Sequence, residues 1–119
     1  MQRNNEEHRI QSAIIQAADS IAEIRGRLFA IPNGGHRDVR TGVKLKREGV
    51  RPGIPDLFLP VARGSFHGLF IEVKTVKGRM SDEQSDWREY LVENQYESIV
   101  VRSAQEAIDA IMDYLWRLR

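Results

Sequence analysis

The first third of the chain has the hydrophobic pattern of one helix followed by one strand. Apolar residues recur at spacings of three and four from Ile10 to Ile24, and Asn4 or Asn5 is placed to cap this helix. The apolar run over residues 27–32, bounded by a proline and two glycines, then predicts a strand.

The middle of the chain predicts a basic helix followed by a β-hairpin. Residues 37–48 are expected to be helical, with Gly49 ending the helix. Two short strands follow over residues 56–61 and 68–75, joined by a polar loop that contains glycine.

The last third predicts a helix, a short buried strand and a second helix. The sequence SDEQ at residues 81–84 is a capping box, SIVV at 98–101 is the strand, and SAQE at 103–106 is a second capping box. The buried side chains are expected to be Trp87, Tyr90 and Leu91 in the first of these helices, and Ala107, Ile108, Ile111, Met112 and Leu115 in the second.

This order of elements, α-β-(α)-β-β-α-β-α, predicts an α/β fold in which helices flank a small mixed sheet. The chain has 119 residues, the size of one domain. It has no cysteine, which excludes a disulfide framework and a thiolate metal site. Because no apolar run reaches membrane-spanning length and the first residues lack a signal-peptide pattern, we expect a soluble cytoplasmic protein without a membrane partner.

Charge is distributed unevenly along the chain, although the net charge is only +1. Residues 36–80 carry ten basic and four acidic side chains, whereas residues 81–119 carry four basic and nine acidic ones. This asymmetry is expected where one face of a protein meets a polyanion, although two solvated surfaces of opposite sign would give the same counts.

Three charged residues lie in the predicted hairpin, where apolar side chains are expected. Glu72 and Lys74 share a face of their strand, and pairing of the two strands brings Asp56 close to Glu72. Adjacent carboxylates are costly to bury unless a positive charge lies between them, and Mg²⁺ bound by both carboxylates, a backbone carbonyl and waters would supply it. Lys74 could then hold or deprotonate a water, or stabilise charge on a phosphate. The alternative is a Glu72–Lys74 ion pair on a solvated sheet face.

Pro55-Asp56, a hairpin and then Glu72-Val73-Lys74 resemble the PD-(D/E)XK nuclease motif. With GIPD, FIEVKT, MSDEQSDW and SIVVRSAQEAIDAIMDYL in this order, nearly the whole chain resembles the VRR-NUC branch, the virus-type replication and repair nucleases. The resemblance implies a restriction-endonuclease-like core and a single VRR-NUC-type nuclease domain over residues 1–119.

The same resemblance implies roles for individual residues. Asp56 and Glu72 would bind Mg²⁺ or Mn²⁺ together with the main-chain carbonyl of Val73. Lys74 would position or activate the water that attacks the phosphodiester.

Two further residues match the family, and each has an alternative interpretation. Gln84 matches a glutamine that the family places beside the site, but it is also the capping-box partner of Ser81. Glu7 matches an acidic residue of the first helix that supports the metal through water, but it is also a favourable first-turn acid.

The basic middle of the chain is the expected DNA surface. If residues 37–48 are helical, four basic side chains share one face, which can follow a phosphate backbone without reading bases. No side chain is an obvious reader of base edges, which favours structure-selective over site-specific cleavage. The expected DNA contacts are Asn33, Arg37, Arg40, Lys44, Arg47, Arg51 and Lys77.

These features predict a metal-dependent, structure-selective endonuclease that acts on branched DNA and needs no nucleotide cofactor. Small members of the family that the chain resembles act as dimers on Holliday junctions. We therefore expect a junction-resolving homodimer of a bacterial host, encoded by a phage or prophage and serving DNA repair. The alternatives are a flap or single-strand nuclease, a catalytically silent DNA-binding module, and an interaction domain in which the basic face has no role.

Overall fold

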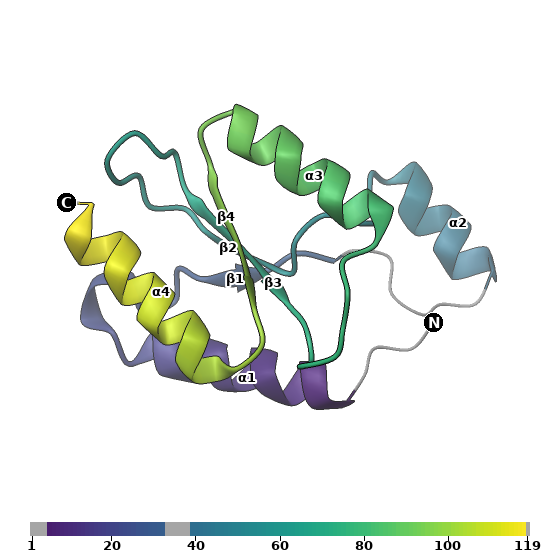
Figure 1. Ribbon diagram of the computed structural model, residues 1–119. Helices are drawn as coiled ribbons and strands as arrows, with labels where there is room; N and C mark the ends of the chain where they lie inside the picture. The colour runs from purple at the N-terminus through teal and green to yellow at the C-terminus, as the bar shows by residue number, and fades with distance from the viewer. Residues whose placement is uncertain (1–4, 33–38, 119) are drawn as a thin grey trace.

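A computed structural model describes residues 5–32 and 39–118, and it has the predicted α/β architecture, a small mixed sheet flanked by helices (Figure 1). The order of elements agrees with the sequence-based prediction, with one additional 3₁₀ turn, η1. The elements are α1 (Asn5–Asp19), η1 (Ala22–Ile24), β1 (Phe29–Ala30), α2 (Val39–Arg47), β2 (Leu57–Leu59), β3 (Leu69–Val73), α3 (Asp82–Glu93), β4 (Glu97–Val101) and α4 (Ala104–Arg117).

The four strands form one sheet in the order β1-β2-β3-β4. β1 with β2, and β2 with β3, are antiparallel, whereas β4 is parallel to β3 because the chain crosses over through α3. Helices α1 and α4 pack against each other on one face of the sheet, and α3 lies on the other (Figure 1). Among the described residues, no helix is long and apolar enough to span a membrane.

Both faces of β3 are buried, which makes this strand the rigid centre of the molecule. Its residues Leu69, Ile71 and Val73 point into the main core, where they meet the apolar faces of α1 and α4. On the opposite face Phe70 stacks on Phe58 with ring centroids 4.3 Å apart. Charged side chains at the end of this strand are therefore held by an ordered, tightly packed scaffold.

The N-terminal elements are shorter than their patterns predict. The apolar stripe to Ile24 does not form one helix, because α1 ends at Asp19 and the chain turns back on itself. In this turn Asp19 Oδ1 accepts a hydrogen bond of 3.0 Å from Gly26 N. Ile24 still packs in the core, but it does so from η1. The apolar residues spaced as in a helix are therefore buried without belonging to one continuous helix. β1 contains two of the six residues expected in the strand over residues 27–32.

The helices of the last third differ from their predicted faces in two places. Tyr90 is exposed, not buried, whereas Leu91 is buried as predicted. On α4, Met112 is exposed and Tyr114 is buried in its place. The Tyr114 hydroxyl donates a hydrogen bond of 2.6 Å to the carbonyl of Val61, so this polar group is satisfied inside the core.

The second predicted capping box forms only in part. Ser103 Oγ accepts a hydrogen bond of 3.1 Å from Glu106 N, as predicted. The Glu106 carboxylate accepts instead from the backbone N–H of Arg102, the residue before the cap. This leaves the end of β4 tied to the first turn of α4.

Candidate active site

The antiparallel pairing of β2 with β3 brings two carboxylates together at the end of the hairpin. Leu57 pairs with Ile71, so the next residues, Asp56 and Glu72, come face to face. Asp56 Oδ2 accepts a hydrogen bond of 2.7 Å from Val73 N, which fixes this carboxylate against β3. Asp56 and Glu72 are only 5% and 4% exposed. The carboxylate pair is therefore buried, and it does not lie on a solvated sheet face.

Two nitrogen groups meet the same oxygen of Glu72. Lys74 Nζ lies 3.7 Å from Glu72 Oε2, and Gln84 Nε2 donates a hydrogen bond of 3.1 Å to this oxygen. Lys74 is itself only 9% exposed. The other oxygen, Glu72 Oε1, is buried and has no hydrogen-bond partner within the described ranges. One oxygen of Glu72 is thus held in place while the other is left to accept a ligand.

The pKa of Glu72 is raised from 4.5 to about 9. Burial is the largest cause, followed by the negative charge of Asp56 and a hydrogen bond between the two carboxyl groups. The Lys74 ammonium lowers the pKa of Glu72 and offsets only part of this rise. The raised pKa favours a proton shared by the pair at neutral pH when no cation is bound, and a bound cation would relieve the same repulsion.

The first turn of α3 places Gln84 beside Glu72. Ser81 Oγ accepts a hydrogen bond of 3.1 Å from Gln84 N, and Gln84 Oε1 accepts one of 2.8 Å from Ser81 N, so the predicted capping box is complete. The amide oxygen of Gln84 serves the cap while its amide nitrogen serves Glu72. The two interpretations offered for Gln84 are therefore compatible.

The loop before β2 packs closely on this turn of α3. Gly53 has φ +90°, and a Cβ at this position would lie 2.6 Å from the carbonyl carbon of Glu83. Only glycine permits this approach without displacing the helix. Gly53 thereby links the loop that carries Asp56 to the turn that carries Gln84.

Arg102 holds the loop after Lys74, a role that we did not predict. Its Nη1 donates to the carbonyls of Thr75 and Gly78 at 2.6 and 2.7 Å. Val73 pairs with Val101 in the parallel ladder, so the residues that follow the two strands are neighbours. The sequence alone does not show that β4 runs beside β3, and the contact of Arg102 with the loop could therefore not be inferred from it.

The comparisons with known proteins identify the family of the chain. The family model of the VRR-NUC domain matches residues 3–105. The chain belongs to the VRR-NUC domain family. A solved structure described as a "VRR_NUC domain protein" is 25% identical, with a TM-score of 0.79 over 95% of this chain and 89% of that one. A second, described as "VRR_NUC domain", is 21% identical, with a TM-score of 0.61 over 92% and 97% of the two chains, and it supports the fold alone. A search of curated proteins found no match.

VRR-NUC domains are part of the nuclease superfamily, so the buried carboxylates are the candidate centre of a nuclease. The residues of this VRR-NUC domain fit a hard divalent cation: two carboxyl groups in contact, one buried oxygen that has no partner in the described part of the chain, and the Val73 carbonyl, which lies between Glu72 and Lys74 in the sequence. Among the described residues, no three histidine, aspartate or glutamate side chains form a cluster that could hold a metal. Waters would therefore complete the coordination, as Mg²⁺ prefers.

Glu7 of the VRR-NUC domain lies close enough to this centre for its charge to act on Glu72. It is half-buried in the first turn of α1, and its negative charge makes a small contribution to the raised pKa of Glu72. Its role in supporting the metal through water stays a prediction.

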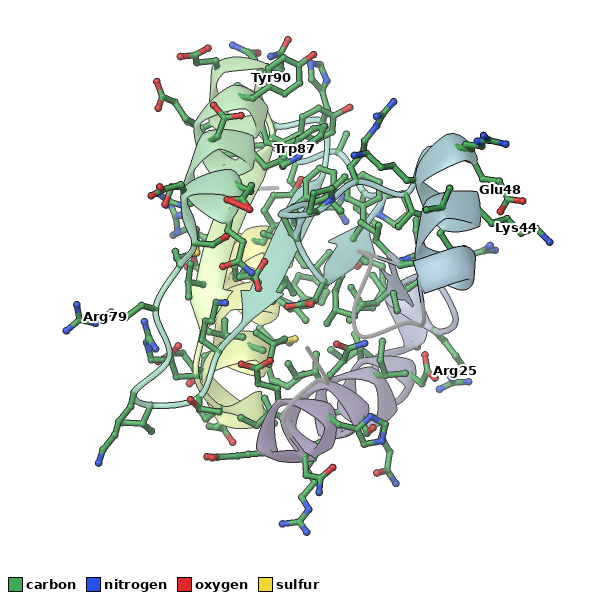
Figure 2. All side chains as sticks on the ribbon, turned by 90° about the vertical axis from the view of Figure 1, so that its right-hand side faces the viewer. Arg25, Lys44, Glu48, Arg79, Trp87 and Tyr90 are labelled. Atoms are coloured by element: carbon green, nitrogen blue, oxygen red, sulfur yellow. The ribbon has the colours of Figure 1, made fainter. Side chains whose placement is uncertain are left out.

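The predicted DNA contacts of the VRR-NUC domain can be placed only in part. Lys44 and Arg47 on α2, and Arg51 after it, are exposed, and Lys44 points away from the body of the molecule (Figure 2). Lys77 is exposed three residues after Lys74. Asn33, Arg37 and the side chain of Arg40 lie outside the described residues, so the single basic face stays a prediction.

Proposed function

We propose that this VRR-NUC domain is a Mg²⁺- or Mn²⁺-dependent endonuclease that hydrolyses phosphodiester bonds in branched DNA. The supporting observation is the buried Asp56–Glu72 pair, with Lys74 on one Glu72 oxygen and no hydrogen-bond partner for the other among the residues that the structure describes. Burying two adjacent carboxyl groups costs free energy, either to bury their charge or to keep one of them protonated, so their presence at the centre of the sheet favours function over stability.

Each residue of the pair has a distinct task in this proposal. Asp56, oriented by Val73 N, and Glu72, oriented by Gln84, would hold the cation together with the Val73 carbonyl. When bound, the cation would neutralise charge on the scissile phosphate and lower the pKa of a water.

Lys74 would act on the water or on the phosphate directly. Its ammonium is held beside Glu72 and is largely shielded from solvent, so it can orient a water or stabilise the charge that grows on a phosphate oxygen. A water-poor setting strengthens such an interaction relative to one at the surface.

The preference for branched DNA and the dimeric state are the finer part of the proposal. One copy of a domain this small covers little DNA, and a two-fold dimer would present two identical sites to the paired strands of a Holliday junction. Exposed cations on α2 and after β3 can contact phosphates of any sequence, which suits an enzyme that selects structure.

The test is cleavage of labelled four-way junction, flap, single-strand and duplex DNA, each with Mg²⁺, Mn²⁺ or EDTA. We expect paired, symmetric nicks in the junction that disappear with EDTA. Cleavage of the flap or the single strand alone would identify that DNA, and not the junction, as the substrate. Tight binding without cleavage of any substrate would overturn the nuclease proposal and leave a DNA-binding module.

A further inference from the structure

The turn that follows β3 and Lys74 presents an apolar side chain next to two exposed basic side chains. Val76 is 75% exposed, more than any other large apolar side chain in the described part of the chain. Lys77 and Arg79 are exposed as well, and neither has an ion-pair partner among the residues that the structure describes. The Val76 side chain therefore contributes little to the core and is accessible to a binding partner.

The turn is held firmly although it protrudes. Gly78 N donates a hydrogen bond of 3.1 Å to the Thr75 carbonyl and closes the turn, with Val76 and Lys77 at its tip. Arg102 then fastens the carbonyls at both ends of the turn to the body of the sheet. A protruding element that is already ordered loses little entropy when it binds.

The turn lies next to the proposed catalytic lysine. Val76 follows Lys74 by two residues, which span at most about 7 Å of chain. DNA whose phosphate is held at Lys74 would therefore pass close to the turn. In Figure 2, Arg79 projects from the same segment at the edge of the molecule opposite Lys44. The two cationic elements can therefore contact phosphates on either side of the site.

We propose that residues 75–79 detect an interruption of base stacking in the DNA. Val76 contacts the open face of a base pair at a branch point, while Lys77 and Arg79 contact the flanking phosphates. In a continuous duplex every base face is covered, so the same contact requires unstacking of a base step. At a branch point a face is already open, so burial of Val76 is gained without this cost. This inference rests on the proposed function and supplies its preference for structure over sequence.

The experiment compares the affinities of variants for a four-way junction and for a duplex of the same sequence. Fluorescence anisotropy is measured in EDTA, so that no DNA is cut. We expect Val76→Ser to lower the ratio of junction to duplex affinity by about tenfold, without changing the dependence on salt. Lys77→Gln should weaken binding to both DNAs and reduce the salt slope by about 1. The matched control is Val92→Ser, the same substitution at a half-exposed position on the acidic helix α3.

The outcomes separate the turn from the active site. If Val76→Ser keeps the wild-type ratio while the wild type still cuts DNA with Mg²⁺, the role of the turn is overturned and the proposed function stands. Equal losses of affinity for junction and duplex would make Val76 a general contact and would also overturn the inference. A wild type that neither binds nor cuts any DNA would overturn both.

Discussion

Replacing Gly53 with alanine tests whether the loop before β2 holds the site together. Two effects add at this position. At φ +90° an L residue is strained, which costs about 1–2 kcal/mol. The new Cβ would also lie 2.6 Å from backbone and side-chain atoms of Glu83, and overpacking of this kind costs about 1–3 kcal/mol. We therefore expect Gly53→Ala to lower the free energy of unfolding by about 2–5 kcal/mol.

Gly49 provides a matched control, because the backbone strain is similar and the steric contact is missing. It has φ +97°, and no atom lies within 4 Å of a Cβ built there. Gly49→Ala should therefore lose only the strain, about 1–2 kcal/mol. Urea unfolding followed by circular dichroism measures both values. Equal losses in the two variants would refute the close contact between Gly53 and α3.

Loss of the close contact between Gly53 and α3 should also change the active site of the folded variant. Displacing the first turn of α3 would move Gln84 away from Glu72, so Gly53→Ala should shift the NMR signal of the Gln84 side-chain amide. In Gly49→Ala this signal should keep its wild-type position.

Three further predictions concern the carboxylate pair, the loop after it and the core. Because the folded protein keeps the Glu72 proton that the unfolded chain releases above pH 4.5, the unfolding free energy of the metal-free protein should fall as the pH rises from 5 to 9. Glu72→Gln should remove this fall. If urea unfolding in EDTA gives the same pH dependence of the unfolding free energy for the variant and the wild type, the raised pKa is contradicted. Arg102→Met should speed amide hydrogen exchange at Gly78 by about tenfold, because methionine has no donor for the carbonyls of Thr75 and Gly78, and an unchanged rate would show that Arg102 does not hold the loop. Tyr114→Phe should lower the unfolding free energy by about 1–3 kcal/mol, because the Val61 carbonyl loses its donor, and thermal unfolding with no change would contradict that bond.

The architecture of the hairpin was predictable because short-range patterns specify it. Alternation in a strand sets which side chains share a face, and a hairpin sets which residues meet across it. Asp56 and Glu72 therefore had to approach each other once both strands formed, and the register of Leu57 with Ile71 confirms it. The capping box at Ser81 is equally local, and it formed as predicted.

The differences arise where tertiary contacts decide between similar local patterns. On α4 a helical stripe can include either Met112 or Tyr114, and the carbonyl of Val61, far away in the sequence, selects the tyrosine. On α3 the pattern placed both Tyr90 and Leu91 on the buried face, but only Leu91 is buried. The hydrogen bonds of Arg102 cross 24 to 27 positions of the sequence, so no local pattern indicates them.

The most direct test of the proposed catalytic centre is single-turnover cleavage of a four-way junction with Mg²⁺ by wild type, Asp56→Asn, Glu72→Gln and Lys74→Met. Asp109→Asn is the control, because it removes an exposed carboxylate on α4, a helix that contributes no residue to the proposed centre. We expect each of the three site variants to cut at least about 100-fold more slowly while still binding the junction, and the control to match the wild type. Cleavage at the wild-type rate by any of the three, or cleavage by the wild type that persists in EDTA, would contradict a metal-dependent centre built on the β2–β3 hairpin.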